Sequence, residues 1–225
     1  MKTMLIRWCA CLALAGAPAF GQGGFEGIVQ SENGTTDELG APQKYVMTIS
    51  VKGKLVRVDI PAYGPEPAMS MIYRPDRRVV WILNEKESSY FEMAQEPGEA
   101  KGGSGGAGIK PTGKKKVILG YPCDQLIAES GDSRTEFWGT KKLGGLAKSM
   151  AAALGTGGEE GGMMNDELAA MGYYPLIART SVEGVVVEWS EVKKVEKRAV
   201  SGEIFEVPKG YRKQTMQELM KGEAD

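Results

Sequence analysis

The chain of 225 residues contains no histidine and only three cysteines. The absence of histidine excludes Ser-His-Asp and Cys-His catalysis and the imidazole ligands on which most zinc and iron sites depend. Cys9 and Cys11 lie in the first apolar run of the chain, so removal of that run would leave Cys123 as the single thiol. An internal disulfide is then excluded even in an oxidising compartment, and stability must come from packing.

The chain also lacks an excess of positive charge. Its 28 basic and 29 acidic residues give a formal net charge of −1. Proteins that bind polyanions usually carry a clear basic excess. We therefore expect no nucleic acid among the partners of this protein.

The first 21 residues have the features of a cleavable signal peptide. Lys2 and Arg7 precede a short apolar run from Trp8 to Ala17. Ala19 and Gly21 then supply the small residues that signal peptidase accepts. The alternative is a membrane anchor, but a span needs about 20 apolar residues, roughly twice the length of this run.

We therefore predict cleavage after Gly21 and export to the periplasm. A lipoprotein signal would require cysteine at position 17, which is alanine. Residues 22–225 are enough for one hydrophobic core, and we predict a single β-rich domain with no transmembrane segment in the mature chain.

Short segments with alternating apolar and polar residues follow one another from Phe25 onward, which is typical of antiparallel strands. Residues 79–83 are apolar at both parities and predict a central strand that is covered on both faces. We predict a mainly β (α+β) fold of about ten strands. The predicted strands are 45–51, 56–60, 69–73, 79–83, 89–93, 116–119, 123–129, 135–138, 176–182 and 185–195.

A helical insert, residues 143–171, interrupts this series before the last hairpin. Its apolar residues recur at the spacing of an amphipathic helix, with a glycine-rich break at 155–162 before a second short helix. A further short helix is predicted at 214–221. Residues 95–116 are rich in glycine and lysine without an apolar period, so we interpret them as a mobile loop.

Three short motifs resemble catalytic or nucleotide-binding signatures but lack the required context. Residues 103–108 match a dinucleotide-binding glycine pattern, and residues 108–114 match most of a phosphate loop, yet a predicted strand follows where a helix is needed. Ser190 and Lys193 fit a Ser-x-x-Lys pair, but they lie in a strand that points them apart. Cys123 has no histidine partner, and we interpret it as an inert core residue. We predict no enzyme, no catalytic residue, no metal site and no cofactor.

Methionine is abundant, with 12 residues against 5 phenylalanines. Methionine side chains fill ordinary cores, but they also adapt to apolar ligands. Two lysine clusters, residues 114–116 and 141–142, are most simply solvated turns. Lysines at the mouth of a cavity would alternatively suit anionic head groups.

Several segments form a recognisable set: 25–27, 52–54 with Arg57, 69–71, 118–123, 135–138 to 143–144, and 204–211. Together they resemble a bacterial envelope family known as a domain of unknown function, number 4412. That family is similar to the LolA-like lipoprotein carriers and lipid-binding lipoproteins. The resemblance implies a strongly curved, unclosed antiparallel β-barrel with helices on its concave face and a ligand cavity between them.

These observations together predict a soluble periplasmic protein that binds a lipid, acyl chain or other apolar ligand without catalysis. The expected lining is Met47, Ile49, Val56, Val58, Met69, Met71, Trp81, Phe91, Phe137, Leu146, Met150, Leu154, Met164, Leu168 and Met171. Strand parity and helical spacing place these residues on one side. The alternative hypothesis is a protein-interaction or envelope-stress module with a dry core, no small ligand and an envelope protein as its partner.

Overall fold

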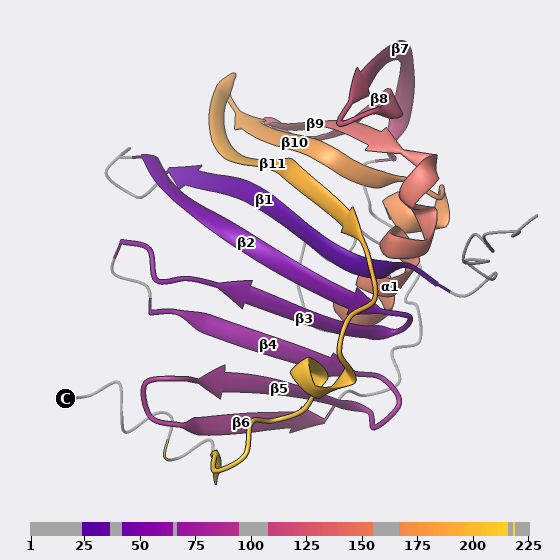
Figure 1. Ribbon diagram of the computed structural model, residues 1–225. Coiled ribbons are helices and arrows are strands. Elements are labelled where there is room, and N and C mark those ends of the chain that lie inside the picture. The colour runs from indigo at the N-terminus through magenta and orange to yellow at the C-terminus, as the bar shows by residue number, and fades with distance from the viewer. Residues whose placement is uncertain are drawn as a thin grey trace, which may run out of the picture.

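A computed structural model describes residues 24–36, 42–64, 67–94, 108–154, 167–215 and 218. These residues form one sheet of twelve strands, in the order β12-β6-β5-β4-β3-β2-β1-β11-β10-β9-β8-β7 (Figure 1). Neighbouring strands are antiparallel except for the pair β12 and β6. The strands are β1 (Glu26–Thr36), β2 (Pro42–Lys52), β3 (Leu55–Ile60), β4 (Met69–Arg74), β5 (Val79–Asn84), β6 (Ser89–Ala94), β7 (Lys110–Ile118), β8 (Tyr121–Ser130), β9 (Ser133–Thr140), β10 (Tyr174–Val182), β11 (Val185–Lys197) and β12 (Arg212–Gln214).

The predicted mainly β class and all ten predicted strands are confirmed, and two strands were missed. β1 was missed because the inward positions of its second half are polar. Asn33 is buried there and donates a hydrogen bond to Ser31 Oγ (3.1 Å). Gly34 in the same strand lies against the indole of Trp189, leaving no room for a Cβ. β12 has three polar residues and no apolar period.

One face of the sheet, which we call the α1 face, carries most of the core. Helix α1 (Gly144–Leu154) packs on it through Leu146 and Ala147, directly after the short helix η1 (Lys141–Leu143). Val29, Val51 and Val56 from the strands beneath are fully buried against the same cluster. Burial of apolar surface of this extent is the main source of stability in the described part of the chain, where Cys123 is a free thiol.

A hydrogen bond from a side chain of α1 to the backbone of the sheet fixes the helix on this face. The Ser149 hydroxyl donates to the Gly53 carbonyl (2.6 Å) in the turn between β2 and β3. Gly145 also packs beside the Phe25 backbone, where a Cβ would make ordinary van der Waals contact with the Phe25 nitrogen at 3.4 Å. The predicted helical insert is thus confirmed for α1 and for a short helical turn at 167–170, whereas the predicted break at 155–162 lies outside the described residues.

The opposite face, which we call the η2 face, is covered by the segment that follows β11. Figure 1 shows this segment crossing the front of the sheet with its short helix η2 (Gly202–Phe205). Phe205 is fully buried against Ile72, Trp81 and Leu83. Cover on both faces therefore explains why residues 79–83 are apolar at both parities. However, β5 lies third from one edge of the sheet, and the prediction of a central strand is wrong.

The prediction of a strongly curved barrel is wrong about the curvature of the sheet. The sheet is unclosed as expected, with β12 and β7 at its two edges, but it is an open sheet that does not curl strongly around the helices (Figure 1). The cause is the cover on both faces: α1 protects one side and the η2 segment the other. Apolar residues on both sides are buried without the sheet having to wrap around a plug.

Two further predictions fall partly outside the described residues. Of the loop predicted at 95–116, residues 95–107 are not described. The loop prediction is wrong for residues 110–116, because they belong to β7. Of the helix predicted at 214–221, most residues are not described, and Gln214 ends β12.

The signal peptide predicted at 1–21 also lies outside the described residues. Among the helices of the described part of the chain, none has the length and apolar character of a membrane span.

Arg74 joins the sheet to the η2 segment, and its removal should weaken the fold. Its buried guanidinium pairs with Asp76 and Glu206 and donates to the Phe205 carbonyl (3.0 Å). We expect Arg74→Ala to lower the free energy of unfolding by about 2 kcal/mol or more, because a buried carbonyl loses its donor. Arg134→Ala, which breaks an exposed pair with Glu129, should cost less than about 0.5 kcal/mol. Urea denaturation measures both, and equal effects would contradict this role for Arg74.

Candidate functional site

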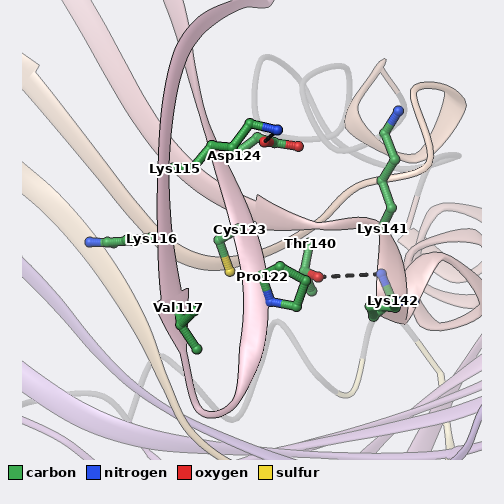
Figure 2. Close-up of a pocket in the computed structure, with 9 residues that line it drawn as sticks. All are labelled: Lys115, Lys116, Val117, Pro122, Cys123, Asp124, Thr140, Lys141 and Lys142. Carbon is green, nitrogen blue, oxygen red and sulfur yellow. Dashed lines mark hydrogen bonds and ion pairs between the residues drawn. The ribbon is translucent and has the colours of Figure 1, made fainter.

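A pocket of about 590 Å³ opens where β7, β8 and the start of η1 meet (Figure 2). It lies at one edge of the sheet, because β7 is the last strand in the order. Four lysines and one aspartate among its nine lining residues leave a formal excess of three positive charges. The lining residues are Lys115, Lys116, Val117, Pro122, Cys123, Asp124, Thr140, Lys141 and Lys142.

The strand register brings the two lysine clusters together. Lys116 pairs with Cys123 between β7 and β8, and Asp124 pairs with Gly139 between β8 and β9. The chain after Gly139 therefore enters η1 beside the start of β8. Buried Thr140 caps this turn by accepting a hydrogen bond from the Lys142 backbone nitrogen (3.3 Å). Sequence reasoning treated the clusters as separate solvated turns, although the register of the two hairpins contains the signal that joins them.

Aromatic rings and one carboxylate hold three of the four ammonium groups. Lys116 Nζ lies 4.0 Å from the centre of the Trp138 ring, and Lys141 Nζ lies 4.8 Å from that of Tyr173. Lys115 Nζ lies 3.4 Å from Asp124 Oδ1. Within the described residues, Lys116, Lys141 and Lys142 have no carboxylate partner, so most of the positive charge is uncompensated.

Asp124 is held as a carboxylate by its neighbours. The Tyr173 hydroxyl donates to Asp124 Oδ2 (2.8 Å), and this hydrogen bond, opposed by partial burial and aided by Lys115, lowers the pKa of Asp124 below its ordinary value. Burial and the same hydrogen bond raise the pKa of Tyr173 to about 12. The pair thus keeps one negative charge at the pocket across the physiological pH range.

Cys123 lines the pocket as a buried thiol. Its side chain is buried, and burial raises the pKa of the thiol above its ordinary value. A neutral thiol is a poor nucleophile. Its sulfur donates weakly to the Tyr121 carbonyl (3.4 Å) instead of to a base. This geometry agrees with the interpretation of Cys123 as an inert residue.

Most of the predicted ligand-lining residues divide into three groups. Ile49, Val56, Val58 and Leu146 lie in the core beneath α1 with exposed fractions between 0 and 3%. Side chains with so little exposure pack against each other and leave no space for a ligand. Phe137, Leu168 and Met171 belong to a second cluster on the same face, near β8 and β9.

Trp81 is wrongly placed by the prediction. It pairs with Ile72 and packs in the cluster beneath η2, on the face opposite α1, where its indole donates to Glu92 Oε2 (2.9 Å). In a segment that is apolar at both parities, sequence alternation does not indicate which residue faces which side. Leu154 ends α1 with an undescribed side chain, and Met164 lies outside the described residues.

The third group, Met47, Met69, Met71 and Phe91, remains partly accessible. Together with Ile60, Ile82 and Met93, which were not predicted, it forms what we call the apolar strip. It lies on the α1 face across β2 to β6, where cross-strand partners place its members on one side. Met69 and Met93 are 36% and 45% exposed, and the other members are half-buried. Half-buried Met150 of α1 packs against the same core. The strip consists of Met47, Ile60, Met69, Met71, Ile82, Phe91 and Met93.

The fold described above, one open antiparallel sheet with a helix on one face, resembles that of another solved structure. An uncharacterized conserved protein from Thermus thermophilus matches with a TM-score of 0.51 and 12% identity, over 84% of this chain and 90% of that chain. At this identity the likeness concerns the fold alone.

Two other structures match less closely. PNGF-II has a TM-score of 0.44 and 12% identity over 88% of this chain, which corresponds to 32% of that chain. A domain from Vibrio parahaemolyticus, named for outer membrane lipoprotein sorting, has a TM-score of 0.24 and 9% identity over 82% of this chain and 90% of that chain. A comparison with curated protein sequences gives no significant match.

The family is shown by sequence. The model of the domain of unknown function DUF4412 matches residues 25–211, which is most of the chain. The chain belongs to this family, and the resemblance predicted from its segments is confirmed.

The Tyr173 hydrogen bond gives the pocket a testable pH dependence. Because the pKa of Asp124 is lowered in the folded state, its stabilising effect is present above the ordinary value of 3.8 and is lost as the pH falls through the folded value. Tyr173→Phe should raise the pKa of Asp124 and make the stability less sensitive to acid. A carboxyl ¹³C NMR titration measures the pKa, with Tyr121→Phe as the control. An unchanged pKa in Tyr173→Phe would show that this hydrogen bond does not hold the carboxylate.

Proposed function

We propose that this protein is an exported, periplasmic binding protein for a lipid, acyl chain or other apolar ligand, and that it performs no catalysis. The observation that supports this proposal is the apolar strip beside α1. Isolated apolar residues are common on protein surfaces, but a contiguous methionine-rich strip across five strands indicates a surface that meets another apolar body.

The ligand lies on the apolar strip and not in the closely packed core beneath α1. Residues under the helix are closely packed, whereas Met69, Met71 and Phe91 keep accessible surface. Tyr45 and Tyr63 extend the strip at one end, with ring centres 4.3 Å apart. Methionine side chains adjust to irregular apolar shapes, which suits a ligand without fixed geometry such as an acyl chain.

The size of the strip is compatible with a chain-like ligand. Adjacent strands lie about 4.8 Å apart, so a strip across five strands is about 19 Å long. Burial of apolar surface contributes about 25 cal/mol per Å², and a bound acyl chain would bury several hundred Å². This free energy is large enough for binding after the cost of ordering the chain is subtracted.

Charged substitutions in the apolar strip should abolish ligand binding while the sheet stays folded. Met69→Glu combined with Met93→Glu changes two exposed positions, so the core beneath α1 is untouched. We expect at least a tenfold loss of affinity for Nile red, a neutral apolar probe, and a similar loss in Met150→Glu. Fluorescence titration measures the affinity, and circular dichroism checks the fold.

The matched control is Val185→Glu combined with Val186→Glu. These two residues are also exposed and apolar, but they lie at the turn between β10 and β11. The control should bind the probe as the unmodified protein does. Normal probe binding by the folded Met69→Glu, Met93→Glu variant would overturn the apolar strip as the site.

The tight packing beneath α1 also agrees with the second hypothesis, a protein-interaction or envelope-stress module with a dry core. The two hypotheses differ in what occupies the apolar strip. The interaction module requires a stoichiometric envelope protein that is lost in the Met69→Glu, Met93→Glu variant, with no uptake of apolar probe by the unmodified protein.

A further inference from the structure

The edge strand β7 and its turn combine exposed apolar residues with clustered lysines. Val117 is 71% exposed and Leu119 is 47% exposed, and they stand two residues apart at the turn into β8. Leu119 adopts a left-handed conformation (φ 50°), which is strained for a leucine. The chain thus accepts a strained backbone that keeps a large apolar side chain in solvent.

The surroundings of these two residues are basic. Lys114, Lys115 and Lys116 precede Val117, and the pocket places Lys141 and Lys142 beside them. Among the described residues that line this pocket, Asp124, paired with Lys115, is the one that is acidic. We call the seven residues Lys114, Lys115, Lys116, Val117, Leu119, Lys141 and Lys142 the β7 surface.

We propose that the β7 surface docks on an anionic phospholipid bilayer. Val117 and Leu119 enter the interfacial region, and the five lysines contact the phosphate groups around them. Apolar residues that insert and cations that bind head groups are the two contributions from which reversible membrane association is built. This surface is separate from the apolar strip and adds a docking function to the proposed ligand binding.

The directions of the lysines favour a surface over one small anion. Figure 2 shows that Lys116 and Lys141 extend to opposite sides of the pocket, so their ammonium groups do not converge on a single point. A single phosphate ion would be held by donors that meet at one place. A bilayer presents many phosphates side by side and satisfies ammonium groups that diverge.

Protection of the sheet edge does not account for these residues. Lysines on an edge strand commonly prevent pairing with other chains, and those in β7 also serve this purpose. A protected edge, however, gains nothing from a strongly exposed Val117 and Leu119. The turn between β10 and β11 has exposed Val185 and Val186 but no lysine cluster, so it provides an internal comparison.

Vesicle co-sedimentation of the exported protein tests the proposal. We expect binding to vesicles that mix phosphatidylglycerol with phosphatidylcholine, little binding to phosphatidylcholine alone, and release in about 0.5 M salt, an ionic strength at which surface charges are screened within a few Å. Lys114→Glu combined with Lys142→Glu should weaken binding at least about tenfold, since each lysine near an anionic surface contributes measurably. Val117→Ser combined with Leu119→Ser should weaken it as well.

Two controls have matched chemistry. Lys86→Glu combined with Lys209→Glu reverses two exposed lysines that have no ion-pair partner among the described residues, and Val185→Ser combined with Val186→Ser removes the other exposed apolar turn. Both should bind vesicles within about twofold of the unmodified protein, as expected for changes outside the contact. Equal binding by the β7-surface variants and their controls would overturn the proposal. Saturable competition by millimolar inorganic phosphate at constant ionic strength would also overturn it in favour of a single-anion site.

Discussion

Because the sheet is open, each of its faces must be covered separately, and this constraint determines the rest of the structure. A twelve-stranded sheet with apolar residues on both sides is stable only when both sides are shielded from water. Helix α1, fixed by the Ser149 hydrogen bond to Gly53, covers one face. The segment around η2, fixed by Arg57 and Arg74, covers the other. Neither cover extends over the whole sheet.

The surfaces that remain uncovered are the ones to which we assign function. α1 has eleven residues, about 16 Å of helix, and is too short to span the width of the sheet. The apolar strip lies on the same face across β2 to β6 and keeps accessible methionines. At the far edge of the described sheet, β7 ends the strand order and displays its lysines together with Val117 and Leu119. We propose that the first surface binds an apolar ligand and that the second docks on an anionic bilayer.

Much of the fold was predictable because alternation in a half-buried strand is a direct consequence of its geometry. Most of the ten predicted strands have clear periods, and the turns at Gly131 and Gly184 have the positive φ that glycine permits. β1 escaped detection because Ser31 and Asn33 occupy inward positions and satisfy each other by a hydrogen bond. β12 is held by pairing with β6 and not by a pattern of its own.

The candidate sites were less predictable than the strands. Met47, Met69, Met71 and Phe91 were placed correctly on one face, since they lie in strands with one wet side. The side faced by Trp81 depends on the η2 segment, which is more than 100 residues away in the sequence. The lysine clusters meet because of the register of two successive hairpins, which we did not trace from the sequence. The curvature of the sheet depends on how both covers pack, which no local pattern contains.

The most direct test of ligand binding is native mass spectrometry, with lipid extraction, on the protein isolated from its own host. We predict a discrete additional mass that corresponds to a bound lipid and is absent from the Met69→Glu, Met93→Glu variant. A bare polypeptide mass under gentle conditions, with no uptake of added lipids, would contradict a lipid-binding role.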